Sequence, residues 1–290
     1  MSEKIFLSII VATIGREVEL ENFLNSVEKI DDKDAIEVII VDQNEDMRLV
    51  PIVNRFQNQL NIKHLKYNEK HANKARNYGA SCALGEWFGF ADDDCAYHLH
   101  TISELKKTIS EQQPQIILGA VVDIEGQLFG RSAKKQATLT KWTILGKVFE
   151  TNMYIEKDIF NQIWGFSNKF GPGSPYFSEE GLELILRAGL SRFSRKKVKI
   201  YYNEVIAVTH PRSNGNRNII SEKIYHYSIG TGAVLAKYLS IWSLIMLIGF
   251  AIVHIKKRIL YKGFEKELAV IRFRGIMMGF TTYLKRKRKL

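Results

Sequence analysis

From Ile5 to Cys95 the chain alternates between short, β-branched apolar runs and amphipathic stretches of helical character. An apolar run of this length, closed by polar or glycine residues, predicts a buried strand of a parallel sheet. The order strand, helix, strand, helix, strand predicts a doubly wound α/β sheet, whose ligands bind beyond the carboxyl ends of its strands. The expected strands cover residues 5–13, 36–46, 61–67 and 86–95, and the expected helices cover residues 18–29, a stretch after Pro51, and residues 71–84.

The middle of the chain continues the pattern less regularly. Strands are expected over residues 115–124 and 199–208, and an extended segment over 147–155, with a basic, polar stretch at 130–141. Residues 170–180 form a loop with two glycines and two prolines, which predicts a shaped, irregular segment leading into a helix over 181–190. We therefore expect one α/β domain over residues 1–235 and a helical appendage over 236–290.

The positive charge lies in the appendage. The chain has 42 basic and 31 acidic residues. Residues 237–290 hold 13 of the basic and 2 of the acidic ones, which leaves 29 of each sign, and no net charge, on residues 1–236. This distribution disfavours a nucleic-acid-binding main domain and directs only the appendage toward anionic partners.

Three consecutive aspartates, Asp92, Asp93 and Asp94, close one of the expected strands. Two unit charges about 4 Å apart repel by roughly 4 kcal/mol at an effective dielectric constant near 20, unless a cation or a basic cluster offsets them. Carboxylate oxygens prefer magnesium or manganese, which commonly bridge carboxylates to substrate phosphates. The cluster predicts a metal site with a diphosphate ligand, and a solvated acidic turn is the alternative.

Two further groups admit a functional and a structural interpretation. Glu179 and Glu180 follow the Gly/Pro-rich loop at a helix start, where a carboxylate either caps the helix or serves as a general base held against an acceptor hydroxyl. His210 follows an expected strand and, on spacing alone, is more often a structural residue than a ligand. Arg76 is on a helix whose basic residues either face solvent or contact a donor.

A nicotinamide cofactor is disfavoured. Asp42 ends the second strand, where an acidic residue binds ribose in dinucleotide folds, but ATIGR follows the first strand in place of a GxGxxG loop.

Taken together, these motifs resemble an inverting glycosyltransferase of the GT-A fold, from the large family that builds bacterial surface polysaccharides. The resemblance covers roughly residues 5–235. It rests on ATIGR after the first strand, KARNYGA, the aspartate trio, SEEGLELILRA and VTH, in the order found in the family. It implies that the nucleotide-sugar donor contacts Ala12, Thr13, Arg16, Asp42, Arg76, Asn77, Asp92 and Asp93.

The resemblance also implies the chemistry. Asp94, with Asp92 and His210, would hold Mn²⁺ or Mg²⁺ against the diphosphate of the donor, with UDP as the favoured carrier. Glu180 occupies the position of the family's catalytic aspartate, a departure that leaves open whether Glu179 or Glu180 is the base. Attack of the acceptor hydroxyl on the anomeric carbon in a single displacement would invert its configuration. The implied acceptor is a lipid-linked glycan.

The appendage predicts contact with a membrane. Residues 239–255 carry no formal charge, KKR follows them, and the chain ends in KRKRKL, which suits anionic lipid headgroups. As a helix, the uncharged run would be about 25 Å long, marginal for spanning a hydrocarbon core of about 30 Å. Residues 268–284 include Arg272 and Arg274, which favours an interfacial helix there. The alternative is a pair of helices packed on the catalytic domain or forming a homo-oligomer.

The resulting expectation is an enzyme at the cytoplasmic face of the membrane, peripheral or monotopic. Two isolated cysteines suit a reducing compartment, and the amino-terminal segment lacks a cleavage site. Two other functions stay open: a nucleotidyltransferase of similar fold, and a non-catalytic, membrane-bound binding module with a structural ion.

Overall fold

The computed structural model describes residues 4–130, 136–190, 198–212 and 215–287. The chain divides into two compact units. Unit 1 comprises residues 1–166 and 184–212, and unit 2 comprises residues 167–183 and 213–290.

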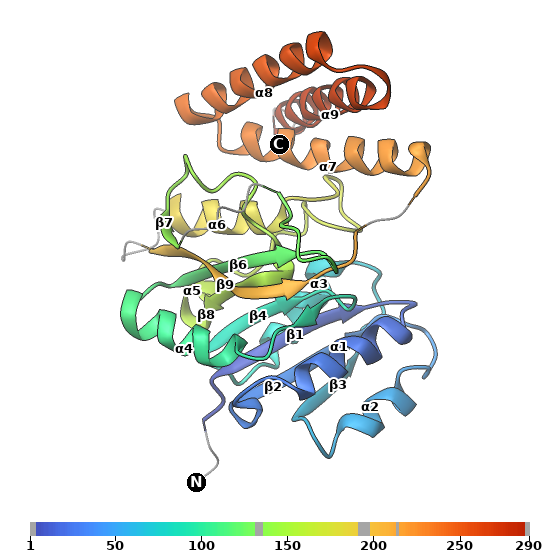
Figure 1. Ribbon diagram of the computed structural model, residues 1–290, viewed down its shortest axis with the longest axis vertical. Coiled ribbons are helices and arrows are strands. Elements are labelled where there is room, and N and C mark those ends of the chain that lie inside the picture. Colours follow the sequence, from blue (N-terminus) through green and yellow to red (C-terminus); the bar gives the residue numbers. More distant parts are fainter. Residues whose placement is uncertain (1–3, 131–135, 191–197, 213–214, 288–290) are drawn as a thin grey trace. The chain divides into compact units, whose positions relative to one another are not determined.

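Unit 1 is built on one mixed sheet with the strand order β3-β2-β1-β4-β8-β6-β9-β5, and β7 pairs with β9. Strands β1, β2, β3 and β4 are parallel, β8 is antiparallel to both β4 and β6, and β6 is parallel to β9 (Figure 1). The expected α/β class is confirmed. The strands are β1 (Leu7–Thr13), β2 (Ile36–Asp42), β3 (Ile62–Lys66), β4 (Trp87–Ala91), β5 (Ala96–Tyr97), β6 (Ile116–Val122), β7 (Ala137–Leu139), β8 (Met153–Glu156) and β9 (Ile200–Thr209).

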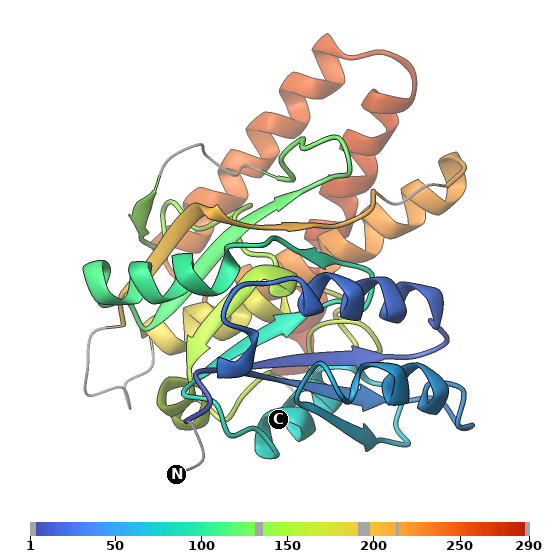
Figure 2. The same ribbon diagram turned by 60° about the horizontal axis from the view of Figure 1, so that its bottom comes forward.

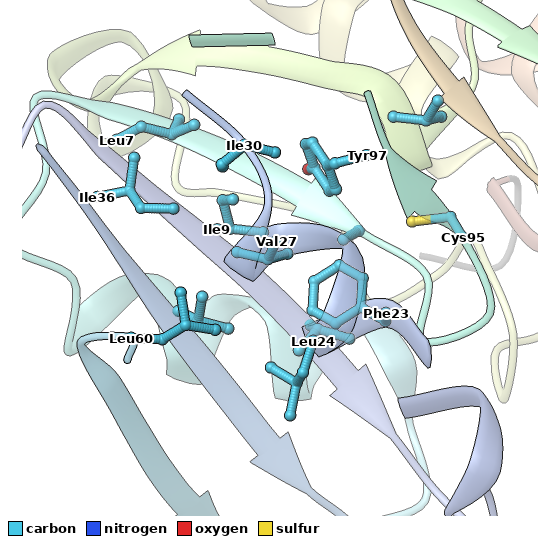
Figure 3. Packing of buried hydrophobic residues seen from close by; sticks show 14 of the residues in the cluster. Leu7, Ile9, Phe23, Leu24, Val27, Ile30, Ile36, Leu60, Cys95 and Tyr97 are labelled. Atoms are coloured by element: carbon cyan, nitrogen blue, oxygen red, sulfur yellow. The ribbon is translucent and has the colours of Figure 1, made fainter. Parts of the chain in front are cut away.

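Alternate residues of the central strands face two different helix layers. One face, with Leu7 and Ile9 of β1, packs on apolar residues of α1 (Val18–Glu28), α2 (Val50–Phe56) and α4 (Thr101–Gln112). Figure 3 shows Phe23, Leu24 and Val27 of α1 in this cluster. Because helices cover both faces of β1, the sequence of this strand is apolar at almost every position.

The other face of the central strands carries α3 (Ala72–Ser81) at close range. A Cβ atom added at Gly79 would lie 2.7 Å from a methyl carbon of Ile10 and 2.8 Å from one of Val41. Glycine at this position lets the helix backbone approach the sheet, which places the amino-terminal part of α3, with Arg76, near the carboxyl ends of the strands.

The prediction of an extended segment over residues 147–155 is partly wrong. Only β8 is a strand, and a short 3-10 helix, η2 (Glu150–Asn152), precedes it. The side-chain amide of Asn152, buried, donates to the carbonyl oxygens of Ala120 (2.7 Å) and Ile206 (2.9 Å). These contacts of Asn152 with two neighbouring strands favour a turn over the extended backbone that the sequence predicts. Residues 131–135 of the basic stretch lie outside the described residues.

Other elements were not anticipated from the sequence. They include α4, in which Ile102 and Leu105 are buried, and the short α5 (Lys157–Gln162). A second 3-10 helix, η1 (Lys33–Ala35), precedes β2. Helix α6 (Glu180–Leu190) begins one residue before the helix expected at 181–190.

Unit 2 is mainly helical. Its long helices are α7 (Arg217–Lys237), α8 (Ile241–Leu260) and α9 (Gly263–Lys287), and the last two form a hairpin, seen in orange and red in Figures 1 and 2. A Cβ at Gly279 would lie 1.9 Å from the carbonyl oxygen of Ile229, so α7 and α9 pack backbone against backbone. Glu183, fully buried, pairs with Lys237 and accepts a hydrogen bond from the hydroxyl of Tyr238 at 3.0 Å.

Within the described part of the chain, the helices all fall short of the length and apolarity needed to cross a membrane.

Candidate active site

The strand order reverses between β1 and β4, and ligands of open α/β sheets bind beyond the carboxyl ends of the strands at such a point. Thr13 ends β1, and the aspartate trio follows β4 directly. The Thr13 hydroxyl donates to the Asp93 carboxylate at 2.6 Å, across the two strands. The structure therefore joins two of the residues expected to contact the donor.

Asp93 is the most enclosed of the three aspartates. Besides Thr13, its partner is Arg16, whose Nη1 lies 2.6 Å from Asp93 Oδ1 and also 2.6 Å from Asp94 Oδ2. Burial raises the pKa of the Asp93 carboxyl above its usual range, against the opposing influence of Thr13 and Arg16. The guanidinium of Arg16 thus offsets part of the repulsion within the trio.

Asp92 and Asp94 meet His210 because of a strand pairing distant in sequence. Strand β5, just after the trio, is antiparallel to β9, with Ala96 opposite Thr209. His210 follows Thr209, and its Nε2 lies 3.2 Å from Asp94 Oδ1 and 3.7 Å from Asp92 Oδ2. One carboxylate oxygen from each aspartate and one imidazole nitrogen lie within 4.8 Å of one another.

The charges of this group depend on one another. Burial opposes ionisation of Asp94, but its hydrogen bond and charge interaction with His210, together with Arg16, hold the pKa of Asp94 below the usual value. Burial likewise lowers the pKa of His210, and the two aspartates more than reverse this effect, so the net shift is upward. A bound divalent cation would replace the imidazole proton.

The His210 ring is held from behind. Its Nδ1 lies 2.8 Å from the carbonyl oxygen of Pro211, an acceptor, so this nitrogen carries a proton and Nε2 faces the carboxylates. The His210 and Phe129 rings pack edge to face, with their centroids 6.0 Å apart. The Arg212 guanidinium lies over the Phe129 ring, 5.0 Å from its centroid. Arg212 Nε in turn donates to Asp123 at 2.5 Å.

The donor atoms fit a divalent cation. Carboxylate oxygens with one imidazole nitrogen suit Mn²⁺ or Mg²⁺, and three protein ligands leave coordination positions for diphosphate oxygens. Asp92 also pairs with Arg76, whose Nη2 lies 3.0 Å from Asp92 Oδ1. The residues expected as metal ligands are therefore together, and a basic side chain stands beside them.

Asp42 organises the end of β2. Its carboxylate is fully buried and accepts hydrogen bonds from the backbone and side chain of Asn44, at 2.9 and 2.8 Å, with His64 and Lys66 at 3.0 and 3.2 Å. The Asn44 side chain accepts from the backbone N–H of Gly15 at 2.7 Å. Asp42 thus fixes the loop that follows β1, and its contact with a nucleotide base stays a prediction.

The remaining donor-site predictions lie on α3 and β1. Arg76 is buried and lies over the Phe166 ring, 5.8 Å from the centroid. The Asn77 side chain donates to the Phe166 carbonyl at 2.9 Å and accepts from its N–H at 2.8 Å, a structural role beside the predicted one. Ala12 is half-buried in β1.

Glu179 and Glu180 belong to unit 2. Glu179 has a positive φ of 67°, and its carboxylate accepts a hydrogen bond from the Thr231 hydroxyl at 2.6 Å. Glu180, the first residue of α6, is buried. The left-handed backbone of Glu179 is a costly conformation for a residue with a Cβ, and such conformations concentrate at functional sites.

Sequence reasoning missed the residues that support the site. They are Asn44, Thr151, whose hydroxyl accepts from the backbone N–H of Asp92 at 3.3 Å, and the set Asp123, Phe129 and Arg212 behind His210. One signal was available: Asp123 closes an apolar strand, as Asp42 and Asp92 do.

Comparison with known proteins adds to this geometry. The family model for glycosyl transferase family 2 matches residues 8–177. Among curated proteins, the chain is 28% identical over 166 residues to poly(ribitol-phosphate) beta-N-acetylglucosaminyltransferase TarS of Staphylococcus aureus, an alignment covering 53% of this chain and 29% of TarS. It is 29% identical over 203 residues to GalNAc(5)-diNAcBac-PP-undecaprenol beta-1,3-glucosyltransferase of Campylobacter jejuni, covering 67% of this chain and 64% of that enzyme. The chain therefore spans less than two thirds of the length of either relative.

Solved structures share the fold. A crystal structure of a TarS fragment in complex with UDP aligns with a TM-score of 0.62 at 18% identity, covering 98% of this chain and 92% of the fragment. The mannosyltransferase PcManGT of Pyrobaculum calidifontis, in complex with GDP-Man and Mn²⁺, aligns with a TM-score of 0.63 at 11% identity, covering 94% and 86% of the two chains.

Proposed function

Because the chain belongs to glycosyl transferase family 2, we propose that it moves a sugar from a UDP-sugar to a hydroxyl of a lipid-linked glycan in the synthesis of a surface polysaccharide. The relatives named above support this proposal: TarS is crystallised with UDP, and the Campylobacter enzyme is named for an undecaprenol-linked substrate. The single observation that carries the proposal is the meeting of Asp92, Asp94 and His210 beyond the carboxyl end of β4, beside the end of β1.

The residues around the aspartate trio have distinct proposed roles toward the donor. Arg16 and Arg76 lie beside the carboxylates and offer guanidinium groups suited to diphosphate oxygens. Asp92, Asp94 and His210 would hold Mn²⁺ or Mg²⁺, a Lewis acid that stabilises charge on a diphosphate leaving group when bound. The remaining donor contacts are those predicted from the sequence: Ala12, Thr13, Asp42, Asn77 and Asp93.

Glu180 is the proposed general base. Glu179 is held by Thr231, which suits a supporting residue, whereas Glu180 starts α6 after the Gly/Pro-rich loop. In the proposed reaction the Glu180 carboxylate accepts the proton of the acceptor hydroxyl, the hydroxyl oxygen bonds to the anomeric carbon, and the bond to the diphosphate breaks with inversion.

The proposed division of labour assigns sugar transfer to residues 1–235 and attachment at the cytoplasmic face of the membrane to residues 236–290. The charge distribution supports it, since residues 237–290 have a net charge of +11 and the preceding part is neutral.

Product analysis with a panel of nucleotide sugars, with and without Mn²⁺, tests the function. Binding is detected first by thermal shift, since a ligand at 100 times its dissociation constant stabilises by about 2.7 kcal/mol. We expect a UDP-sugar to stabilise the protein with Mn²⁺ and to yield free UDP with a glycosylated acceptor. Release of pyrophosphate would instead identify a nucleotidyltransferase. Metal-dependent stability without any donor turnover would identify a binding module.

A further inference from the structure

Helix α8 exposes a long apolar row. Isoleucines recur along it at intervals of four and three residues, which places them on one face. Their exposed fractions range from 45% at Ile245 to 78% at Ile241, and the row comprises Ile241, Ile245, Ile248, Ile252, Ile255 and Ile259. Leu244, Val253 and Leu260, also exposed, widen it. Contiguous apolar patches above a few hundred Å² are uncommon on monomeric soluble proteins and mark interaction surfaces.

The opposite face of α8 is already occupied inside unit 2. Trp242 and Ser243 are buried at its start, and the His254 ring stacks on Phe273 of α9 at 4.7 Å with an interplanar angle of 9°. His254 Nδ1 also lies 3.1 Å from the carbonyl oxygen of Ala269, on α9. His254 thus joins α8 to α9, and the isoleucine row lies on the other face of α8.

Helix α9 does not offer a comparable face. Ala269, Gly275, Ile276 and Gly279 are buried, and Gly275 and Gly279 bring its backbone against α7. Several small and apolar residues of 268–284 are therefore buried in packing inside unit 2. The interfacial helix expected over residues 268–284 stays a prediction, and the long exposed apolar row is on α8.

The charged residues of α8 indicate which kind of partner fits the apolar row. Helix α8 has no acidic residue, and Lys256, Lys257 and Arg258 lie in its last turns, with Lys262 just beyond. Lys and Arg side chains are attracted to the surface of an anionic bilayer. Such a bilayer complements both the apolar row and the basic end.

A second copy of the chain is the weaker partner. The isoleucine spacing matches a coiled-coil seam, but seams are specified by opposite charges at their flanking positions. Here those positions hold Leu244 and Gly249 early in the helix and Lys256 and Arg258 later. A parallel pairing would gather like charges without an acidic partner.

We propose that the outer row of α8 inserts in the plane of an anionic bilayer, with the basic residues at its carboxyl end among the phosphate headgroups. This surface gives the proposed membrane location a defined contact. It does not depend on the sugar-transfer chemistry, so either proposal can fail alone.

Sedimentation of the full-length protein with phosphatidylcholine vesicles, with and without phosphatidylglycerol, tests the proposal. We expect binding to the anionic vesicles that weakens with added salt. Replacing the middle of the row (Ile245→Ser, Ile248→Ser and Ile252→Ser together) should weaken binding on the order of a hundredfold, since each buried isoleucine contributes to insertion. Lys256→Gln with Arg258→Gln should weaken the preference for phosphatidylglycerol.

The matched control replaces equally exposed apolar residues of unit 1, namely Leu84→Ser, Leu99→Ser and Ile124→Ser, and should bind as the unmodified protein does. Circular dichroism checks that each variant is folded, and light scattering measures its oligomeric state. Equal vesicle binding by the isoleucine variant, or no binding by the unmodified protein, would overturn the proposal. So would an oligomer that the isoleucine changes dissociate, which would assign the row to a second copy. Vesicle binding without UDP-sugar turnover would leave this surface standing and remove only the proposed function.

Discussion

The three aspartates differ in what surrounds them. Asp93 is tied to Thr13 and Arg16, whereas Asp92 and Asp94 turn toward His210. Because Arg16, Arg76 and His210 already offset much of the negative charge, repulsion alone does not require a metal ion here. The convergence of two carboxylates and one imidazole favours a bound cation.

Asp94→Asn is expected to remove most Mn²⁺ binding, because a neutral amide replaces a charged ligand. Titration of Mn²⁺, followed by electron paramagnetic resonance, measures the loss directly. The exposed Asp34→Asn is the control and should bind as the unmodified protein does. Unchanged affinity in Asp94→Asn would place the metal elsewhere.

Arg212→Ala is expected to weaken Mn²⁺ binding by about 10-fold to 100-fold, the usual effect of losing a group that orients a metal ligand. Arg212 packs on Phe129, which contacts the His210 ring, and Asp123 holds Arg212, so Arg212 is a positioning residue. Binding of UDP without metal should stay constant in this variant, and Arg55→Ala serves as a surface control. A parallel loss of metal-free UDP binding would indicate general disruption of the site.

Glu180→Gln should lower kcat by about 10²-fold to 10⁴-fold, with the donor KM little changed, because only proton acceptance is lost. Glu179→Gln retains an acceptor for the Thr231 hydroxyl and should keep most activity. Steady-state kinetics of both variants separates the roles. Near-native transfer by Glu180→Gln would make Glu179 the base.

At the scale of elements, close backbone approach decides where helices lie. Helix α3 packs this close to the sheet because residue 79 has no side chain. The same condition holds where α9 meets α7 at Gly279. These glycines determine which apolar faces are covered and, through α9, which face α8 leaves exposed.

Gly79→Ala is expected to destabilise unit 1 by about 1–3 kcal/mol, since the added methyl group would overlap methyl groups of Ile10 and Val41. Gly249→Ala is the matched control in a helix, with open space around the added atom, and should be neutral or stabilising by up to about 1 kcal/mol. Urea unfolding compares the two. Equal stability of both variants would show that α3 can shift without cost.

At the scale of the whole molecule, stability and charge are distributed unevenly. The neutral part of the chain carries buried ion pairs within the sheet. Glu37, fully buried on β2, accepts from Ser8 at 2.6 Å and pairs with Lys63 at 2.8 Å. Burial opposes its ionisation, but these partners and the backbone N–H of Leu84 bring the pKa of Glu37 below its usual value.

A lowered folded-state pKa makes stability depend on pH in one direction. The contribution of ionised Glu37 is complete above the unfolded-state pKa and is lost as the pH falls through the folded-state value. Glu37→Gln should therefore lower the free energy of unfolding at neutral pH by about 1.5–3 kcal/mol, and the difference should shrink on acidification below a pH of about 4.5. Urea unfolding across this range measures it, with the exposed Glu45→Gln as control. A constant difference at every pH would contradict the assignment.

The sequence by itself determined the fold class and the order of the motifs, because the alternation of strands with helices and the turn after each strand are local properties. The residues of the candidate metal site were also predictable from it, through their resemblance to a known family. The concentration of basic charge after residue 236 needed only counting.

Only the tertiary structure decided which of these residues meet and what holds them. His210 reaches Asp94 because β5 pairs with β9, a contact between segments more than 100 residues apart, which no local pattern encodes. Phe129 and Arg212 lie behind His210 because β6 pairs with β9, with Val122 opposite Thr209. The uncharged run of α8 and the run of α9 that includes Arg272 and Arg274 both predicted contact with a membrane, but α9 packs on α7 whereas the isoleucine row of α8 is exposed.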